Sequence, residues 1–320
     1  MKSNTVWCVL LIMTFFPAVA LAQPEEREKG GFFGNIVLGG GFAAGRPSQL
    51  HVTDDNKKID SLNEKAVRQE RGIPFYMGEI GYIIVGTGTK ISLGNQKGEK
   101  SIGALAVEQS LNKIGIVRTT VGYGQEDVWA DPYLAGIQRE ETDETSYNVT
   151  LEFEEIAGTG AMASLTFSDI DVDQDRIGER CPDLKRDGEI MAAAIGYTIP
   201  LGEDQAIIPS FEMEVEDRDG ESNSGRQYKI ELAHLLGLGS WSFATSVALI
   251  DREFDKIHPV FHATRDEKGI EVGEMIAYAE PFGWKGFSIN GLITYTRMDA
   301  NIDFFSSNEM IIGMGIGYSF

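Results

Sequence analysis

The chain has 320 residues, of which 37 are glycine, and its formal net charge at pH 7 is −21. The 49 acidic residues against 28 basic ones argue against a nucleic-acid-binding protein, which needs a basic surface. Glycine is above its usual share without a Gly-X-Y period, which excludes a collagen-like chain.

The amino terminus has the features of a secretory signal peptide. Lys2 supplies the positive charge, an apolar run follows over residues 6–16, and Ala20-Leu21-Ala22 has the form of a cleavage site. We therefore predict that residues 1–22 are removed and that residues 23–320 form one domain. No later apolar run approaches the ~18 residues of a helical membrane span. The mature chain then contains a single thiol, Cys181, which excludes an internal disulfide and a cysteine-based metal site.

From Phe33 onward, long segments alternate between apolar and polar residues, as β-strands do. In residues 241–249, for example, Trp, Phe, Val and Leu fall on one face while Ser and Ala fall on the other. Short glycine-containing turns and longer polar loops connect the segments in alternation. The predicted strands cover residues 33–43, 74–85, 89–96, 101–111, 115–126, 144–156, 161–173, 188–201, 206–218, 226–236, 241–255, 269–281, 287–300 and 308–320.

A soluble β-sandwich also alternates, but three details favour a membrane. The segments have about the 9–11 residues of a tilted span, their connections alternate between short and long, and aromatic residues lie at the ends of their apolar faces. These aromatic residues are Phe32, Phe42, Tyr76, Trp241, Phe287, Tyr295 and Phe320. We therefore predict an all-β fold, a transmembrane antiparallel up-and-down β-barrel of fourteen strands. Segment 89–96 is the weakest of them, and twelve strands is the alternative. Glu274 falls on an apolar face, which suggests a β-bulge there.

The last strand is predicted to close the barrel against residues 33–43. From Met310 its large residues alternate with small ones, so its inward face is a smooth stripe of Gly313, Gly315, Gly317 and Ser319. A barrel needs such a pairing, because a free strand edge invites aggregation.

The blocks Val128-Trp-Ala-Asp-Pro-Tyr-Leu134, Thr142-Asp-Glu144, Ile156-Ala-Gly-Thr-Gly160 and Asp169-Ile-Asp-Val-Asp173 resemble an uncharacterised family of exported Gram-negative proteins. The resemblance covers most of the mature chain, including the closing strand. It implies an outer-membrane barrel and no particular activity. Gly315, Tyr318 and Phe320 resemble the signal that the barrel-insertion machinery reads, although Gly313 stands where that signal usually has a polar residue.

Charged residues lie on the predicted inward faces, and they indicate the lining of the barrel. The candidates are Glu79, Glu108, Arg118, Glu152, Glu154, Glu212, Glu214, Glu216, Lys229, Glu231 and Arg297. Two interpretations remain open. The acids line a water-filled pore that favours cations, or the charges form a salt-bridge network that fills the interior. A folded-in loop, such as residues 44–73, would plug a pore of either kind.

Three further patterns are weak site candidates. Asp169, Asp171, Asp173 and Asp175 alternate at a strand end, where their oxygens offer a Ca²⁺ site, but a solvated acidic rim is the simpler interpretation. His258 and His262 have the spacing of a helical metal site, but Pro259 disfavours a helix. Gly39-x-Gly41-x-x-Ala44 mimics a dinucleotide fingerprint without the helix that must follow it. We therefore predict no metal site and no cofactor.

The sequence thus predicts a barrel in the outer membrane of a Gram-negative bacterium that acts as a passive channel or transporter for small solutes, with an acidic lumen. Lipopolysaccharide, outer-membrane lipid and the insertion machinery are the other expected partners. A structural or surface-binding barrel is the alternative. An outer-membrane hydrolase is third, because His234 lies near Ser240, Ser242 and Ser246 across a hairpin. We expect no enzymatic activity.

Overall fold

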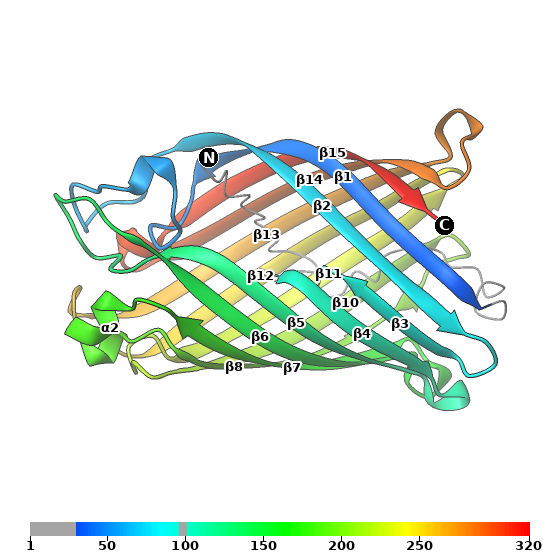
Figure 1. Ribbon diagram of the computed structural model, residues 1–320, viewed down its shortest axis with the longest axis horizontal. Coiled ribbons are helices and arrows are strands. Elements are labelled where there is room, and N and C mark those ends of the chain that lie inside the picture. Colours follow the sequence, from blue (N-terminus) through cyan, green and yellow to red (C-terminus); the bar gives the residue numbers. More distant parts are fainter. Residues whose placement is uncertain (1–29, 96–100) are drawn as a thin grey trace.

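The computed structural model describes residues 30–95 and 101–320, so the predicted signal peptide lies outside the described residues. Most of the described chain forms one antiparallel sheet that closes on itself (Figure 1). Its strands are β1 (Gly31–Arg46), β2 (Gln69–Ile84), β3 (Thr89–Gly94), β4 (Ser101–Ser110), β5 (Ile116–Trp129), β6 (Glu141–Glu154), β7 (Ala161–Val172), β8 (Gly188–Tyr197), β9 (Ile199–Pro200), β10 (Gln205–Arg218), β11 (Gly225–Leu238), β12 (Trp241–His258), β13 (Ala263–Ala279), β14 (Phe287–Ala300) and β15 (Ser307–Ser319).

The predicted count of fourteen strands is confirmed. β8 and β9 both pair with β10 and are separated only at Thr198, so together they form the single strand predicted at residues 188–201. Each strand pairs with the next along the chain, and β15 pairs with β1 from Asn35↔Ser319 to Arg46↔Asn308. The weak segment 89–96 is a real but short strand, β3.

The bulge predicted at Glu274 is wrong. Register is continuous through Glu274 on both sides, against β12 and against β14. The shift between β12 and β13 falls instead between Glu253 and Ile257, at the loop end of that hairpin. Glu274 therefore keeps its place on the apolar face, where it accepts a hydrogen bond from the neighbouring strand.

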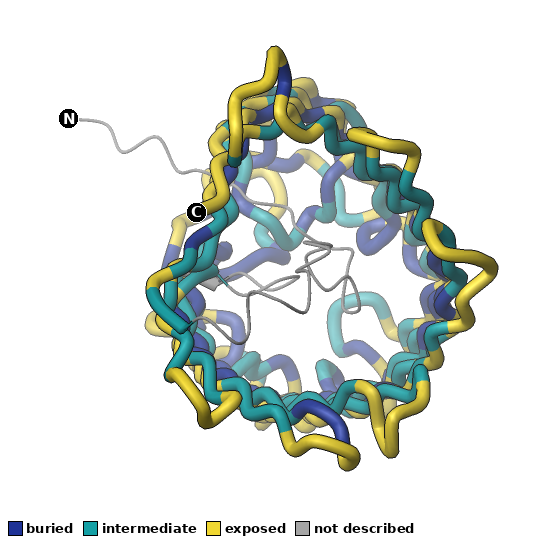
Figure 2. The backbone as a smooth tube through the Cα atoms, turned by 90° about the vertical axis from the view of Figure 1, so that its right-hand side faces the viewer, coloured by how far each residue is buried: buried dark blue, intermediate teal, exposed yellow. Residues whose placement is uncertain are grey.

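The outward face of the barrel is apolar. Leu38, Leu165, Leu249 and Met314, on four different strands, are 58–67% exposed. In the view along the barrel, the strands form a closed ring around the interior (Figure 2). A continuous belt of exposed aliphatic and aromatic side chains is the surface of a transmembrane barrel, because lipid then replaces the core that would otherwise cover it. None of the helices in the described residues is long and apolar enough to cross a membrane.

The two ends of the barrel differ. Tight turns lie at one end, and three of them contain the 3₁₀ helices η2 (Asn112–Ile114), η3 (Ile156–Gly158) and η5 (Pro281–Gly283). Long loops lie at the other end, with the short helices α2 (Arg176–Arg180), η1 (Asp54–Asn56), η4 (Pro182–Leu184) and η6 (Asp303–Phe305) (Figure 1). This is the predicted alternation of short and long connections. One mouth of the barrel therefore has only tight turns, whereas the long loops lie at the other mouth.

Backbone hydrogen bonds and small residues hold the closing seam. The amide of Phe320 donates to Gly34 O at 3.0 Å, and the amide of Gly34 donates to Phe320 O at 2.9 Å. The Phe320 ring covers Gly34, where a Cβ atom would come within 2.6 Å of it. On the inward face, the ring of Phe75 from β2 lies over Gly39 and Gly313. The glycine stripe predicted on the inward face is therefore present, and Phe75 shields part of it.

The same seam carries a hollow on its lipid-facing side. Gly40 and Gly72 face outward without side chains between Phe42, Ile312 and Met314, and the open space there is about 610 Å³. A Cβ atom on either glycine would make only ordinary van der Waals contact, 3.7 Å from Ile73 O at Gly40 and 4.0 Å from Gly41 O at Gly72. The hollow belongs to the outer surface of the barrel and not to its interior.

Candidate functional site: the charged interior and the loop cap

A first group of charges lies on the inward faces of β2 to β6. Arg118 is at its centre, with its guanidinium nitrogens 3.3 Å from Glu79, 3.9 Å from Glu108 and 3.7 Å from Glu152. Lys90 lies 3.6 Å from Glu79 and over the ring of Phe33. The ion-paired side chains are 19–32% exposed, so this first charge group is partly hydrated rather than sealed.

A second group of charges lies on β10, β11 and β13 and is more deeply buried. Lys229 Nζ is 2.9 Å from Glu271 and 3.3 Å from Glu231, and the three side chains are 9%, 1% and 3% exposed. Glu212 is the register partner of Lys229 on β10. One lysine thus serves at least two buried carboxylates with a third beside it, and Glu271 Oε1 has no hydrogen-bond partner among the described residues.

A third group of charges continues toward the loop end. Arg252 pairs with Glu216 and lies 3.9 Å from Glu267, and Arg265 lies 2.5 Å from Glu267. Arg218 is 3.6 Å from Glu216. The guanidinium of Arg265 also stacks on the rings of Phe254 in the wall and Phe305 in a loop, at 4.3 Å and 3.8 Å. This third charge group therefore connects the wall to the loops above it.

The remaining lining candidates are placed as follows. Glu154 ends the inward face of β6, and Glu214 lies between Glu212 and Glu216 on the inward face of β10. Arg297 was assigned to the interior, and that assignment is wrong. It shares the outward face of β14 with Tyr295 and pairs there with Asp299 at 2.8 Å, both side chains about half exposed. The alternation from Phe287 onward already places Arg297 on the aromatic face.

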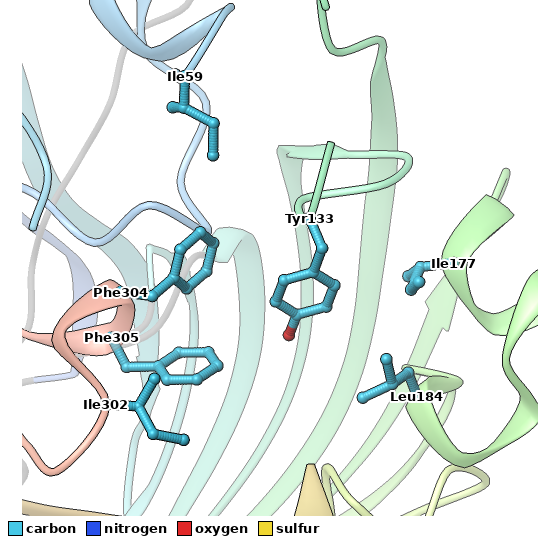
Figure 3. Packing of buried hydrophobic residues seen from close by; sticks show 7 residues of the cluster. All are labelled: Ile59, Tyr133, Ile177, Leu184, Ile302, Phe304 and Phe305. Carbon is cyan, nitrogen blue, oxygen red and sulfur yellow. The ribbon is translucent and has the colours of Figure 1, made fainter. Parts of the chain in front are cut away.

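The long loops fold together into a cap over one mouth of the barrel. We define the cap as residues 47–68, 130–140, 173–187, 219–224, 259–262 and 301–306. Its core contains the buried residues Ile59, Tyr133, Ile177, Leu184, Ile302, Phe304 and Phe305 (Figure 3). Ile59 and Phe304 come from beside the β15–β1 seam, whereas Ile177 and Leu184 come from the β7–β8 connection, half-way round the barrel. The cap core therefore crosses the mouth from side to side.

The segment Trp129-Ala-Asp-Pro-Tyr133 lies at the centre of the cap. Trp129 is fully buried and donates from Nε1 to His51 O at 3.1 Å. Arg139 stacks on the Trp129 ring and donates to the carbonyls of Asn56, Gln49 and Pro132. Burial lowers the pKa of Arg139 to about 10. The segment thus joins the loop after β1 to the loop after β5.

The acidic cluster predicted at the end of β7 does not converge. Asp169 and Asp171 are exposed on the outward face, whereas Asp175 is buried and is held 2.7 Å from Arg186. The amide of Arg186 also donates to Asp175, and its guanidinium donates to the carbonyls of Trp129 and Ala130. In the described part of the chain no three His, Cys, Asp or Glu residues are grouped to hold a metal ion. Asp175 therefore fastens α2 to the centre of the cap instead of binding Ca²⁺ with Asp173.

His258 is buried in the cap with a defined tautomer. The amide of Val260 donates to Nδ1 at 3.2 Å, so neutral His258 carries its proton on Nε2, which lies 3.0 Å from the Tyr133 hydroxyl. The rings of Tyr133, Phe261 and Phe305 surround it. Burial and the nearby charge of Arg265 lower the pKa of His258 to about 4, at a position beyond the belt. His258 is thus part of the cap core and is not paired with His262 on a metal.

The hydrolase alternative has no Ser–His pair in this hairpin. His234 faces outward on β11 beside Gln205, at 2.8 Å between their nitrogens. Ser242 and Ser246 alternate with exposed Trp241 and Val247 and therefore face inward, on the other side of the wall. His234 and the two serines are thus close along the hairpin, as the sequence predicts, but they lie on opposite faces of the wall.

Several interior charges escaped prediction from the sequence. Lys90, Arg252, Arg265, Glu267 and Glu271 all face inward and form the ion pairs described above. Period-two alternation through residues 263–279 does carry the signal, since Arg265, Glu267 and Glu271 fall opposite Val272 and Ile276. Arg265 and Glu267 precede the predicted start of this strand at residue 269, because β13 begins six residues earlier, whereas Glu271 lies inside the predicted strand.

A family model described as "Protein of unknown function (DUF2860)" matches residues 31–319, and the chain belongs to this family. The expected membership of an uncharacterised family is thereby confirmed. No curated protein sequence matches the chain.

Solved outer-membrane barrels resemble the chain in fold. An anion-selective porin from Comamonas acidovorans is 9% identical, with 91% of this chain and 100% of that chain covered and a TM-score of 0.45. A loop L8 deletion mutant of OmpT, an outer membrane protein of Vibrio cholerae, is 11% identical over 91% and 99%, with a TM-score of 0.45. A Pseudomonas aeruginosa FadL homologue is 8% identical over 90% of each chain, with a TM-score of 0.40.

Proposed function

We propose that this protein is an outer-membrane channel that conducts small cationic solutes, with the cap controlling entry at one mouth. The proposal rests chiefly on the composition of the described inward faces. Around Lys229, Glu212, Glu231 and Glu271 outnumber the one cation, and around Arg118 the glutamates again outnumber the cations. A barrel lined in this way attracts cations and repels anions.

The polarity of the molecule supports its orientation. An apolar outer belt with a charged interior suits a barrel whose lipid-facing and lumen-facing residues alternate. In such barrels short turns face the periplasm and long loops face the exterior, so we place the cap outside the cell. The interior of a fourteen-stranded barrel is wider than that of an eight-stranded one, whose side chains fill it. We expect lipopolysaccharide around the outer half of the belt, and Gly315, Tyr318 and Phe320 to be read by the insertion machinery.

The cap is the element that would control entry. Its core joins loops from opposite sides of the mouth, so a solute must pass beside it or wait for it to open. Arg265 stacks on Phe305 and pairs with Glu267, which couples the cap to the charged wall. The same packing favours a second candidate function, a closed barrel whose cap binds an external surface or ligand.

Conductance in a planar bilayer tests the channel. Purified, heat-modifiable barrel should give stable steps, and a salt gradient should give a reversal potential of the sign expected for cations. Glu271→Gln should reduce this cation preference, because it removes a buried interior charge. The matched control Glu189→Gln changes an exposed outward glutamate on β8 and should leave selectivity unchanged.

Opening the cap separates the two candidate functions. If the wild-type barrel is silent but Phe304→Ala conducts, the cap is a gate. If both are silent although folded, the channel proposal is overturned and the surface-binding function stands.

A further inference from the structure

One small region of the lipid-facing belt is polar. Four neighbouring strands present an outward polar residue there, and we name the four the belt cluster: Gln205 on β10, His234 on β11, Thr245 on β12 and Glu274 on β13. Along each strand apolar residues flank the ionisable members. His234 follows Leu232, and Glu274 lies between Val272 and Ile276. In the described residues, the other outward-facing Asp, Glu, Lys, Arg and His of the strands, such as Asp251 and Lys268, lie farther toward the loop end of the barrel, and the rest lie in connections.

Register and hydrogen bonds make these residues one cluster. His234 is the Cα partner of Thr245, and Thr245 is the Cα partner of Glu274, so the three form a row across three strands. The hydroxyl of Thr245 donates to Glu274 Oε2 at 2.5 Å. Gln205 Nε2 lies 2.8 Å from His234 Nε2. Each of these hydrogen bonds engages one atom of an ionisable side chain. The row therefore has the His234 imidazole at one end and the Glu274 carboxyl group at the other.

Such a cluster is unfavourable against hydrocarbon. Ionisable side chains in a lipid-facing position destabilise a barrel, most strongly near the middle of the membrane. Thr245 and Glu274 each lie four residues along the strand from Trp241 and Tyr278, an aromatic pair at the turn end of the belt. This is roughly 10 Å toward the membrane centre for a tilted strand, below the level of lipid headgroups. Apolar residues would serve packing better, as they do elsewhere in the belt.

We propose that the belt cluster is the centre of an interface between two copies of this chain in the membrane. The row is self-complementary about a two-fold axis parallel to the barrel axis and passing beside Thr245. His234 and Glu274 lie on opposite sides of Thr245, roughly 10 Å apart across two strand spacings. Rotation by 180° about this axis brings the Glu274 side of one copy opposite the His234 side of the other, so each Glu274 faces His234 of the second copy. Strand tilt separates the two in depth by about 6 Å, a gap that a glutamate and a histidine side chain together span.

A second copy fits this surface better than other membrane components. It inserts in the same orientation, so its own cluster lies at the same depth, and it brings a donor opposite each acceptor. Leu232, Phe243, Val247 and Ile276 surround the row and supply apolar surface that two walls can share. Lipid headgroups lie too far toward the interface to reach the row, and acyl chains offer it no hydrogen bond.

The dimer is tested by native mass spectrometry of the full chain from detergent micelles and by single-molecule subunit counting in supported bilayers. Wild type should be dimeric. Glu274→Gln should raise the dimer dissociation constant about tenfold, which corresponds to about 1.4 kcal/mol, because it weakens the hydrogen bonds between Glu274 and His234 of the second copy. The exchanged double variant His234→Glu with Glu274→His keeps the complementarity and should restore dimers. The matched control Glu189→Gln should behave as wild type.

Two results would overturn the interface. One is a monomeric wild type in both measurements, which includes the case in which a different protein covers the cluster. The other is a dimer that Glu274→Gln leaves unchanged. Heat-modifiable migration verifies that each variant is folded, and if the double variant does not fold, the comparison of Glu274→Gln with Glu189→Gln decides. The dimer does not depend on conduction, so a silent barrel leaves this inference intact.

Discussion

The cap and the barrel wall bury opposite kinds of residue. Phe304 and Leu184 in the cap are fully buried, whereas Leu38 and Met314 on the wall are 62% and 67% exposed and the wall instead buries Lys229 and Glu271. The cap is stabilised like a small soluble domain, by removal of aromatic surface from water. The wall is stabilised by a closed hydrogen-bond ladder, by ion pairs inside and by lipid outside. The two parts should therefore fail under different changes and at different stabilities.

The largest loss of stability is expected from a substitution in the wall. Lys229→Met leaves Glu231 and Glu271 without their cation in a buried site, which should lower the free energy of unfolding by about 3–5 kcal/mol. Urea unfolding of the barrel in lipid vesicles measures it. Lys268→Met, an exposed change on β13, is the control and should stay within about 0.5 kcal/mol of wild type. Equal effects of the two variants would show that the second charge group does not stabilise the wall.

The next effect should be confined to the cap. Phe304→Ala removes a buried ring from the cap core and should destabilise the cap by about 3–4 kcal/mol, because a cavity remains between Tyr133 and Phe261. Hydrogen exchange should rise in residues 130–140 and 301–306, while heat-modifiable migration of the barrel stays as in wild type. Loss of the folded barrel together with the cap would contradict the independence of the two parts.

Acid should also open the cap selectively. The pKa of His258 is about 4 when folded and about 6.5 when unfolded, so folding favours the neutral ring. Its contribution is therefore fully present above pH 6.5 and is lost as pH falls toward 4. Protonation at Nδ1 would face the amide of Val260 and the charge of Arg265. Cap stability should drop by on the order of 3 kcal/mol over this range.

Limited proteolysis of the cap at several pH values measures this loss. His258→Gln removes the titrating group and should flatten the profile between pH 6.5 and 4. His262→Asn is the control, since asparagine tolerates the positive φ of that residue, and it should keep the wild-type profile. A wild-type cap equally resistant at pH 4 and pH 7 would contradict the role of His258.

The wall was largely predictable and the cap was not. Period-two alternation is local information, and it placed all fourteen strands and most inward glutamates, because lipid and lumen impose opposite polarity on successive residues. The error at Arg297 came from setting aside that same alternation. The cap depends on contacts between loops far apart in sequence, such as Tyr133 with Phe304 and His258, which no local pattern encodes. The Trp129–Tyr133 segment is recognisable as a motif in the sequence, but its central place in the cap follows only from the fold.

The smallest change in stability is expected at the glycine stripe of the seam, where the inward residues are small. A Cβ atom on Gly313 would lie 2.8 Å from the Phe75 ring, which must shift, whereas on Gly39 it would lie 2.4 Å from the backbone oxygen of Met314. Gly313→Ala should therefore cost about 1 kcal/mol and Gly39→Ala about 1–3 kcal/mol, since a ring can move and a paired strand cannot.

Urea unfolding in vesicles ranks the two seam variants, and Gly72→Ala, which points into the open outer hollow, is the neutral control. A Gly313→Ala barrel less stable than Gly39→Ala would mean that Phe75 is fixed over the stripe. In that case side-chain packing would stabilise the seam, as it stabilises the cap. The wall formed by β1, β2 and β15 would then not differ from the cap in what stabilises it.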